Sequence, residues 1–185
     1  MTGLLGGAFD PPHRGHVALA ETALDHFELE RLLVLVVVDP GHREVQLGFE
    51  DRFRLAELAF GALPRTEVVR DEHRYTVDAV RGGRFGDAIF LVGADEFAGF
   101  LSWKDPDGVL DEVRLGVAAR PGYPSSPLEE ALAKLERPDR VEFFEIPALP
   151  ISSTDIRARV ARGEPVDELV PEAVARKIDR SGLYR

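Results

Sequence analysis

The segment Gly6-Gly7-Ala8-Phe9-Asp10-Pro11-Pro12-His13-Arg14-Gly15-His16 decides how the rest of the sequence is interpreted. It follows a short apolar run at 2–5 and precedes a stretch whose apolar residues recur at helical spacing. Two adjacent glycines remove side chains where the predicted strand ends, so a phosphate group can approach the backbone closely. Gly15 opens the predicted helix, whose free N–H groups and dipole favour an anion. The segment therefore predicts an anion site between the first strand and the first helix.

Two histidines strengthen this interpretation. His13 and His16 are three residues apart across the start of the helix, so both side chains can point toward one spot. Imidazole donates hydrogen bonds to phosphate oxygens, and does so more strongly when it is protonated. A glycine pair alone is also compatible with a tight turn, and a single histidine with a structural role. The combination of two glycines, Phe-Asp-Pro and His-x-Gly-His is far more specific, and it favours phosphate binding.

Predicted strands and helices alternate along the chain. Strands are predicted at 2–5, 32–38, 66–69, 88–92, 114–118 and 141–146. Helices are predicted at 15–27, 50–60, 76–81, 128–135, 154–162 and 172–180, and a loop at 121–127. The continuously apolar runs at 32–38 and 88–92 are typical of strands that are buried on both faces. The pattern predicts an α/β fold, a Rossmann-like doubly wound parallel sheet with helices on both faces, which binds ligands at the carboxyl ends of its strands.

Length and composition limit the remaining choices. The chain has 185 residues without a repeat or an obvious linker, which predicts a single domain over 1–185 with a C-terminal helical part at about 152–185 packed on it. A net charge of −10 argues against nucleic acid as a partner. The absence of cysteine and of an apolar run of about 18 residues indicates no disulfides and no membrane span, so we expect a cytoplasmic protein. A homo-oligomer is left open.

A second segment at 151–157 reads Ile-Ser-Ser-Thr-Asp-Ile-Arg. Ser152 or Ser153 can cap the helix that follows, and the same helix N-terminus offers hydroxyl and N–H groups to a triphosphate. Arg157 lies about one turn further on and can clamp phosphate oxygens with its planar fork. A plain helix cap formed by Ser152 with Asp155 is the alternative for this segment taken alone.

Together these two segments resemble the two signatures of the nucleotidyltransferase superfamily marked by a His-x-Gly-His motif. Within that superfamily the chain most resembles the bacterial nicotinate-nucleotide adenylyltransferases, nearly from end to end. The other matching stretches are His42-Arg43, a helix at 52–59, Tyr75-Thr76-Val77-Asp78, Gly93-Ala94-Asp95, Trp103, Arg120-Pro121-Gly122 and Leu183-Tyr184.

The resemblance implies a reaction of nicotinate mononucleotide with ATP that gives deamido-NAD and pyrophosphate by direct in-line attack. It implies catalytic roles for His13, His16 and Arg157. Residues implied in ATP binding are Gly6, Gly7, Ala8, Phe9, His16, Gly93, Asp95, Ile151, Ser152, Ser153 and Arg157. Residues implied in binding the pyridine mononucleotide are His42, Arg43, Tyr75, Thr76 and Trp103. Mg²⁺ is expected to accompany ATP with few protein ligands, since no Asp/His cluster has the spacing of a dedicated metal site.

Two other interpretations stay open. One is a related transferase that acts on nicotinamide mononucleotide or on a pantetheine phosphate, although His13, Tyr75 and Trp103 argue against the latter. The other is a catalytically silent nucleotide-binding module, and its support comes from departures from the family pattern. Ala8 stands where the family usually has Thr or Ser, and Asp39 brings a negative charge beside the proposed anion site. A Rossmann oxidoreductase is excluded because no Gly-x-Gly-x-x-Gly follows the first strand.

Several of these residues also have ordinary structural interpretations. Thr76 begins a predicted helix and can serve as its N-cap, and Asp95, as the residue after Gly93-Ala94, can equally be an N-cap. Trp103 is the single tryptophan and can be a core residue as readily as an aromatic wall against a pyridine ring. Pro40-Gly41-His42-Arg43 replaces the Pro-Pro-His-Lys of the family, which exchanges a point charge for a planar guanidinium.

Overall fold

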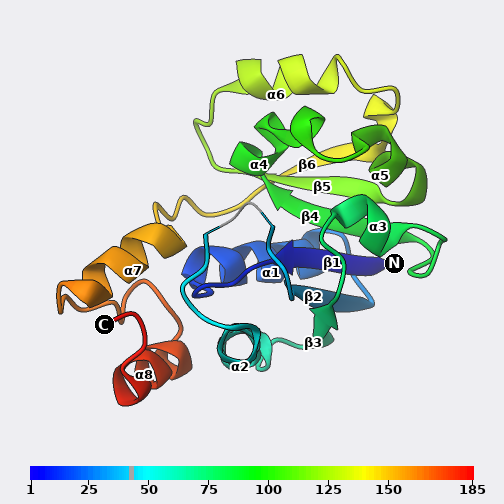
Figure 1. Ribbon diagram of the computed structural model, residues 1–185. Helices are drawn as coiled ribbons and strands as arrows, with labels where there is room; N and C mark the ends of the chain where they lie inside the picture. Colours follow the sequence, from blue (N-terminus) through cyan, green and yellow to red (C-terminus); the bar gives the residue numbers. More distant parts are fainter. Residues whose placement is uncertain (42–43) are drawn as a thin grey trace.

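The computed structural model describes residues 1–41 and 44–185 and contains one six-stranded sheet. Its strand order is β3-β2-β1-β4-β5-β6, and every neighbouring pair is parallel (Figure 1). The strands are β1 (Thr2–Gly7), β2 (Arg31–Val37), β3 (Thr66–Asp71), β4 (Ala88–Gly93), β5 (Arg114–Ala119) and β6 (Val141–Glu145). The chain moves outward from β1 to β3 on one side and from β4 to β6 on the other. The topological switch point therefore lies between β1 and β4.

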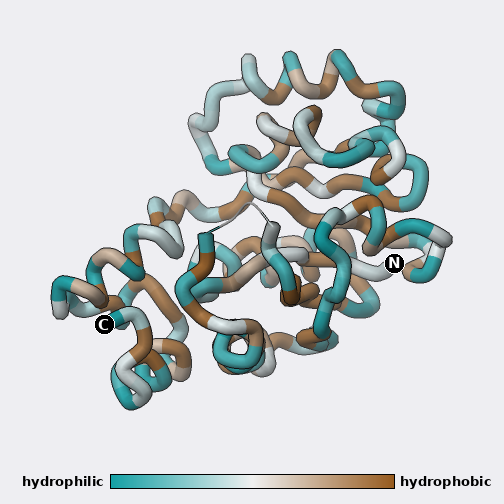
Figure 2. Tube along the Cα trace, viewed as in Figure 1, coloured by the Kyte–Doolittle hydropathy of each residue, from teal (hydrophilic) through white to brown (hydrophobic). Residues whose placement is uncertain are grey.

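The buried strands send alternate side chains into two separate cores. Leu5 of β1 packs on one face of the sheet, and its neighbour Leu4 packs on the other. In β4, Leu91 belongs to the first core, and Phe90 and Val92 belong to the second. Because successive residues of a strand point to opposite faces, a continuously apolar strand is stable only when helices cover both faces. In Figure 2, brown (hydrophobic) stretches lie along the strands in the middle of the molecule, as this double burial requires.

Helices cover both faces of the sheet, as the sequence predicts. The first core contains side chains of α1 (Arg14–His26), α2 (Phe49–Phe60), α7 (Ser153–Ala161) and α8 (Glu172–Ser181). The second contains side chains of α3 (Thr76–Val80), α4 (Ala94–Ala98), α5 (Pro106–Glu112) and α6 (Ser125–Leu132). Two short 3₁₀ turns, η1 (Phe100–Ser102) and η2 (Pro138–Arg140), complete the described elements. Within the described ranges, no helix is long and apolar enough to cross a membrane.

The structure corrects some details of the predicted elements. β1 continues through Gly6 and Gly7, and α1 begins at Arg14 with His13 as its N-cap, one residue earlier than expected. The stretch 121–127 is not all loop, because α6 already begins at Ser125. The helices α4 and α5 were not predicted. They have five and seven residues, too few for an apolar period to emerge from the sequence.

Candidate active site

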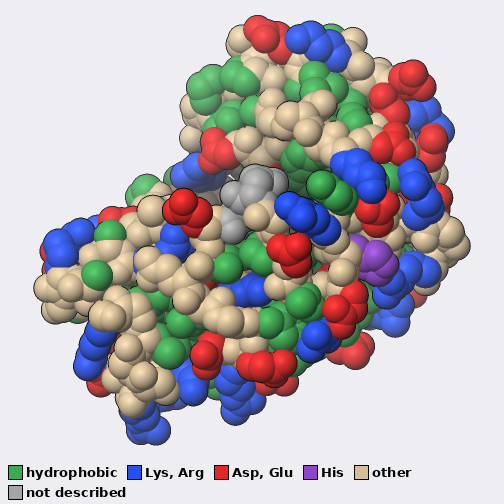
Figure 3. Space-filling view, viewed as in Figure 1, with side chains coloured by type: hydrophobic (Ala, Val, Ile, Leu, Met, Phe, Trp, Pro, Cys, Tyr) green, Lys and Arg blue, Asp and Glu red, His purple; other side chains and the backbone are tan. Residues whose placement is uncertain are grey.

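A cavity of about 370 Å³ opens at the carboxyl ends of β1 and β4, where the strand order reverses. Figure 3 shows the molecule hollowed in this region, with hydrophobic side chains in the hollow and charged side chains around it. The predicted site residues that line the cavity are Gly6, Gly7, Ala8, Tyr75, Thr76, Asp95 and Trp103. Segments that are far apart in the sequence thus meet at the position where doubly wound sheets bind ligands.

Gly6 and Gly7 have a packing role in addition to the one inferred from the sequence. A Cβ atom added to Gly6 would lie 2.8 Å from the ring of Phe90, and one added to Gly7 would lie 2.9 Å from the ring of Phe9. Both distances are too short for real contacts, so larger residues would displace aromatic rings of the two cores. Ala8 follows them, and its carbonyl accepts a hydrogen bond from Arg52 Nη1 at 2.8 Å. The main chain at Ala8 is therefore held without any contribution from its side chain.

His13 and His16 form a stacked pair beside this strand end. Their ring centroids are 3.7 Å apart with an angle of 24° between the planes. The backbone N–H of His13 donates to Nδ1 of His16 at 3.2 Å, so the proton of a neutral His16 ring sits on Nε2. Burial, and then the proximity of His16, lowers the pKa of His13 to about 2. His13 is therefore neutral at physiological pH.

The second signature contacts the first directly. Ser152 is the N-cap of α7, and its hydroxyl accepts from the backbone N–H of Asp155 at 3.1 Å. Ser153 Oγ donates to the carbonyl of Pro11 at 2.8 Å, and Arg157 Nη1 donates to the carbonyl of Asp10 at 2.8 Å. The half-buried Ile151 packs against the first core. Ser153 and Arg157, both predicted to bind triphosphate, thus use one donor each to hold the opening segment.

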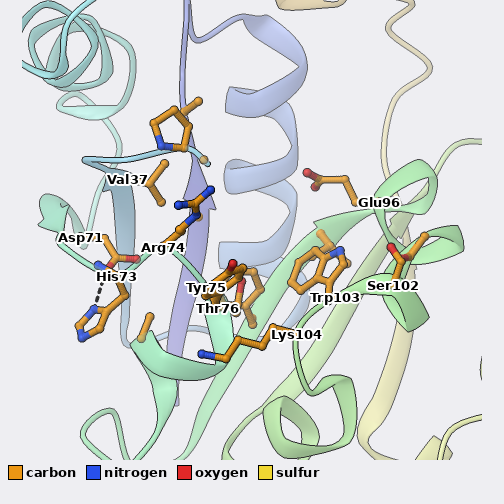
Figure 4. Close-up of a pocket in the computed structure, with 18 of the residues that line it drawn as sticks. Val37, Asp71, His73, Arg74, Tyr75, Thr76, Glu96, Ser102, Trp103 and Lys104 are labelled. Carbon is orange, nitrogen blue, oxygen red and sulfur yellow. Dashed lines mark hydrogen bonds and ion pairs between the residues drawn. The ribbon is translucent and has the colours of Figure 1, made fainter. Parts of the chain in front are cut away.

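Tyr75 and Trp103 project into the same cavity from different parts of the chain (Figure 4). Tyr75 is the N-cap of α3, so Thr76 is the first helical residue and not the cap. The indole of Trp103 packs edge-on against Phe100 at 5.1 Å between centroids and against Phe90 at 6.3 Å. Trp103 therefore packs on aromatic side chains of the second core and also lines the cavity.

Gly93 and Asp95 lie at the end of β4. Gly93 is the N-cap of α4, so Asp95 is not the cap that the sequence left as an alternative. The Asp95 carboxylate accepts from Arg120 Nη2 at 3.1 Å and lines the cavity, whereas Gly93 lies beside it. Phe9, which is also predicted to bind ATP, is 3% exposed. Its ring packs edge-to-face on the His16 ring, with 5.3 Å between the ring centroids.

His42 and Arg43 lie outside the described residues, so the structure does not address their predicted role. The neighbouring Asp39 is described. Its carboxylate accepts from the backbone N–H of Gly41 at 3.0 Å and lies 3.7 Å from Arg74 Nη1. The negative charge that departs from the family pattern is therefore partly compensated by a cation that lines the cavity.

Sequence reasoning missed several residues that hold the site together. Arg52 is 1% exposed and donates to the carbonyls of Ala8, Val37, Val38 and Leu47. His73 and Asp71 form a 2.7 Å contact at the edge of the cavity. An arginine on a helix is most often solvated, and only its position among apolar residues on the buried face of α2 could have indicated otherwise.

No group of three or more His, Cys, Asp or Glu side chains is arranged as metal ligands within residues 1–41 and 44–185. A divalent cation at this site would therefore have to take its other ligands from a substrate or from water.

The fold and the paired signatures define the class of protein. The family model described as cytidylyltransferase-like matches residues 4–159, so the chain is a nucleotidyltransferase of that class. A protein of Moorella thermoacetica is 39% identical over 99% of this chain and 91% of its own length, and one of Rubrobacter xylanophilus is 36% identical over the same shares. Both carry the curated name "probable nicotinate-nucleotide adenylyltransferase". The chain belongs to the nicotinate-nucleotide adenylyltransferase family.

Solved structures agree on the fold. The nicotinic acid mononucleotide adenylyltransferase of Plasmodium falciparum, complexed with APC, superposes with a TM-score of 0.79 at 16% identity, covering 99% of this chain and 96% of that one. The same enzyme complexed with NaAD has a TM-score of 0.77. At this identity the similarity is one of fold.

Proposed function

We propose that this protein joins nicotinate mononucleotide to the adenylyl group of ATP and releases deamido-NAD and pyrophosphate. The observation that carries the proposal is the cavity at the switch point, because it brings the glycines of the opening segment together with Tyr75 and Trp103. The names of relatives that match nearly the whole chain support the same reaction.

The reaction needs no covalent enzyme intermediate. An oxygen of the mononucleotide phosphate forms a bond to the α-phosphorus of ATP, and the bond from that phosphorus to the bridging oxygen of the β-phosphate breaks. The electron pair leaves with pyrophosphate. Because the attacking phosphate is already an anion at neutral pH, catalysis rests on positioning and on stabilising the charge of the transferring group.

We assign the charge-stabilising role to His16, with His13 beside it. The hydrogen bond accepted by Nδ1 of His16 leaves its Nε2–H as the donor of the neutral ring, and this proton can bind a phosphate oxygen. Ser152, Ser153 and Arg157 are proposed to bind the β- and γ-phosphates. Arg157 Nη1 donates to the carbonyl of Asp10 at 2.8 Å, and its Nη2 donates to Thr154 Oγ1 at 3.4 Å.

We infer that Mg²⁺ enters with ATP and that phosphate oxygens of ATP supply most of its ligands besides water. Bound there, the ion would neutralise phosphate charge. Among the predicted ATP-binding residues that line the cavity, Asp95 is the one with a carboxylate that could bind the ion. In this structure its carboxylate is paired with Arg120.

The acceptor is proposed to lie with its pyridine ring between Tyr75 and Trp103. The first N–H groups of a helix have no partner within the helix, and those that begin α3 at Thr76 can donate to a carboxylate. An amide offers its own N–H donors to the same groups and leaves some of them unpaired. The site therefore favours nicotinate over nicotinamide mononucleotide.

A panel of acceptors tests the proposal. The protein is incubated with ATP and Mg²⁺ together with nicotinate mononucleotide, nicotinamide mononucleotide or a pantetheine phosphate, and pyrophosphate release is measured. Release is expected to be fastest with nicotinate mononucleotide. Equal rates with the two pyridine mononucleotides would refute the carboxylate preference, and no release with any acceptor would favour a silent nucleotide-binding module.

A further inference from the structure

The C-terminal part of the chain is hydrogen-bonded to the opening segment along its length. Figure 1 shows α7, α8 and the C-terminus gathered on the same side of the sheet. The five bonds given by the described residues are Ser153 Oγ to Pro11 O (2.8 Å), Arg157 Nη1 to Asp10 O (2.8 Å), Arg14 Nη2 to Asp167 O (3.3 Å), Arg14 N to Leu169 O (2.9 Å) and Tyr184 Oη to Asp10 Oδ1 (2.8 Å). Only the last of these involves a side chain of the opening segment that is itself charged and buried.

Asp10 is 3% exposed, and a buried carboxylate is costly unless its oxygens are hydrogen-bonded. Here both oxygens are bonded: Oδ1 accepts from the hydroxyl of Tyr184, and Oδ2 accepts from the backbone N–H of Gln46 at 2.6 Å. The buried guanidinium of Arg52 adds electrostatic attraction. Asp10 is thus anchored from the last residues of the chain and from the segment that precedes α2.

Tyr184 is suited to this anchoring role. It is 8% exposed, and burial together with the Asp10 carboxylate raises the pKa of its phenol above the ordinary value, so the hydroxyl stays protonated and donates. Its backbone has φ 65°, a left-handed conformation that a residue with a side chain adopts only where its surroundings hold it. Tyr184 therefore combines a conformation that its surroundings hold with a hydroxyl that donates to Asp10.

The position of Asp10 determines that of the histidines. Only Pro11 and Pro12 separate Asp10 from His13, and proline rings fix the φ angles of this link. On the other side, Phe9 has φ 52° and packs on the ring of His16. A displacement of Asp10 is therefore transmitted to the stacked imidazoles and is not absorbed by a flexible loop.

We propose that Tyr184 is a positioning residue for the transferase site: its hydroxyl holds Asp10 and, through Asp10, keeps His13 and His16 in their stacked arrangement. The kinetic consequence of this proposal rests on the proposed function, whereas its structural consequence does not.

The test is Tyr184→Phe, which keeps the ring and removes only the hydroxyl, with Arg185→Ala as the matched control. Arg185 is the neighbouring exposed residue, and it contacts Asp179 instead of the opening segment. In Tyr184→Phe, kcat is expected to fall about 10-fold to 100-fold, the range for a small misplacement of catalytic groups, while KM for ATP stays within about 2-fold. The ring resonances of His13 and His16 in NMR spectra are expected to shift, and those of His26, at the other end of α1, to stay. Arg185→Ala is expected to change none of these.

Unchanged kcat in active Tyr184→Phe would overturn the proposal. A lower kcat with unshifted His13 and His16 resonances would also overturn it, because it would show a role other than positioning. If the wild-type protein transfers no adenylyl group, the proposed function fails and the ring resonances alone decide whether Tyr184 positions the histidines. Should Tyr184→Phe not fold, Asp10→Asn provides a second measurement, because its single amide oxygen cannot accept from both Tyr184 and the Gln46 N–H as the carboxylate does; unshifted rings there would count against the proposal.

Discussion

The backbone N–H of His13 donates to Nδ1 of His16 at 3.2 Å, and the two rings stack with centroids 3.7 Å apart. The cap of α1 and the proposed catalytic pair are therefore the same two residues. This contact selects the His16 tautomer that carries its proton on Nε2, so an ordinary capping hydrogen bond prepares a donor for phosphate.

His16→Ala is expected to fold normally and to lose about two to four powers of ten in kcat, the range seen when an electrostatic donor is removed from an active site. The measurement is pyrophosphate release at saturating substrates. His26→Ala is the matched control, since His26 lies at the other end of the same helix and is about 3.7 Å from Glu142 on the surface. Near-normal turnover of His16→Ala would contradict the role assigned to it.

His13 is expected to make stability depend on pH. Its pKa is lowered to about 2 in the folded protein and is about 6.5 in the unfolded chain. Below pH 6.5 the unfolded state binds the extra proton, so the free energy of unfolding rises with pH up to about 6.5 and this contribution is constant above it. Between pH 5 and 6 the free energy of unfolding of the wild-type protein should rise by about 1 kcal/mol more than that of His13→Asn.

Urea denaturation of both proteins at pH 5.0, 5.5, 6.0 and 7.5 measures this difference, because groups other than His13 contribute equally to the two curves. If the stability curves of wild type and His13→Asn run parallel over this range, His13 is not buried in its neutral form.

Arg52 is expected to matter for stability far more than its residue type suggests. Arg52→Met removes the donors for the carbonyls of Ala8, Val37 and Val38, and it leaves buried Asp10 without its cation. We expect a loss of about 3–5 kcal/mol in the free energy of unfolding, as for a broken buried ion pair. Arg54→Met, two residues away on the exposed face of α2, should cost less than about 1 kcal/mol. Similar losses in thermal denaturation of the two variants would show that Arg52 is not the buried anchor.

Trp103 is expected to affect the acceptor more than ATP. In Trp103→Ala the KM for the pyridine mononucleotide should rise about 10-fold to 100-fold, which corresponds to the loss of a large buried aromatic contact. Trp103→Phe should lose less, because it keeps a ring against Phe100 and Phe90. Steady-state kinetics with each substrate varied in turn provides the test. An equal rise of KM for ATP would mean that Trp103 supports the whole site and not the acceptor pocket.

The sequence by itself determined the fold class and the loop at which a ligand is predicted to approach the sheet. The continuously apolar runs required a sheet covered on both faces, and the glycines with His-x-Gly-His marked the loop at which ligands approach. Tyr75, Thr76 and Trp103 were predicted together from the family pattern, and the structure places all three on one cavity. These features are local in the chain or repeat a pattern, so residue order alone carries them.

Only the tertiary structure decided which polar groups meet across long separations. Asp10 and Tyr184 are 174 residues apart in the sequence, and Arg52 reaches carbonyls from two other segments. No spacing rule predicts such contacts, since burial converts side chains that are ordinarily solvated into obligatory hydrogen-bond partners. The same burial lowers the pKa of His13, and it explains why Tyr184 is hydrogen-bonded to the opening segment.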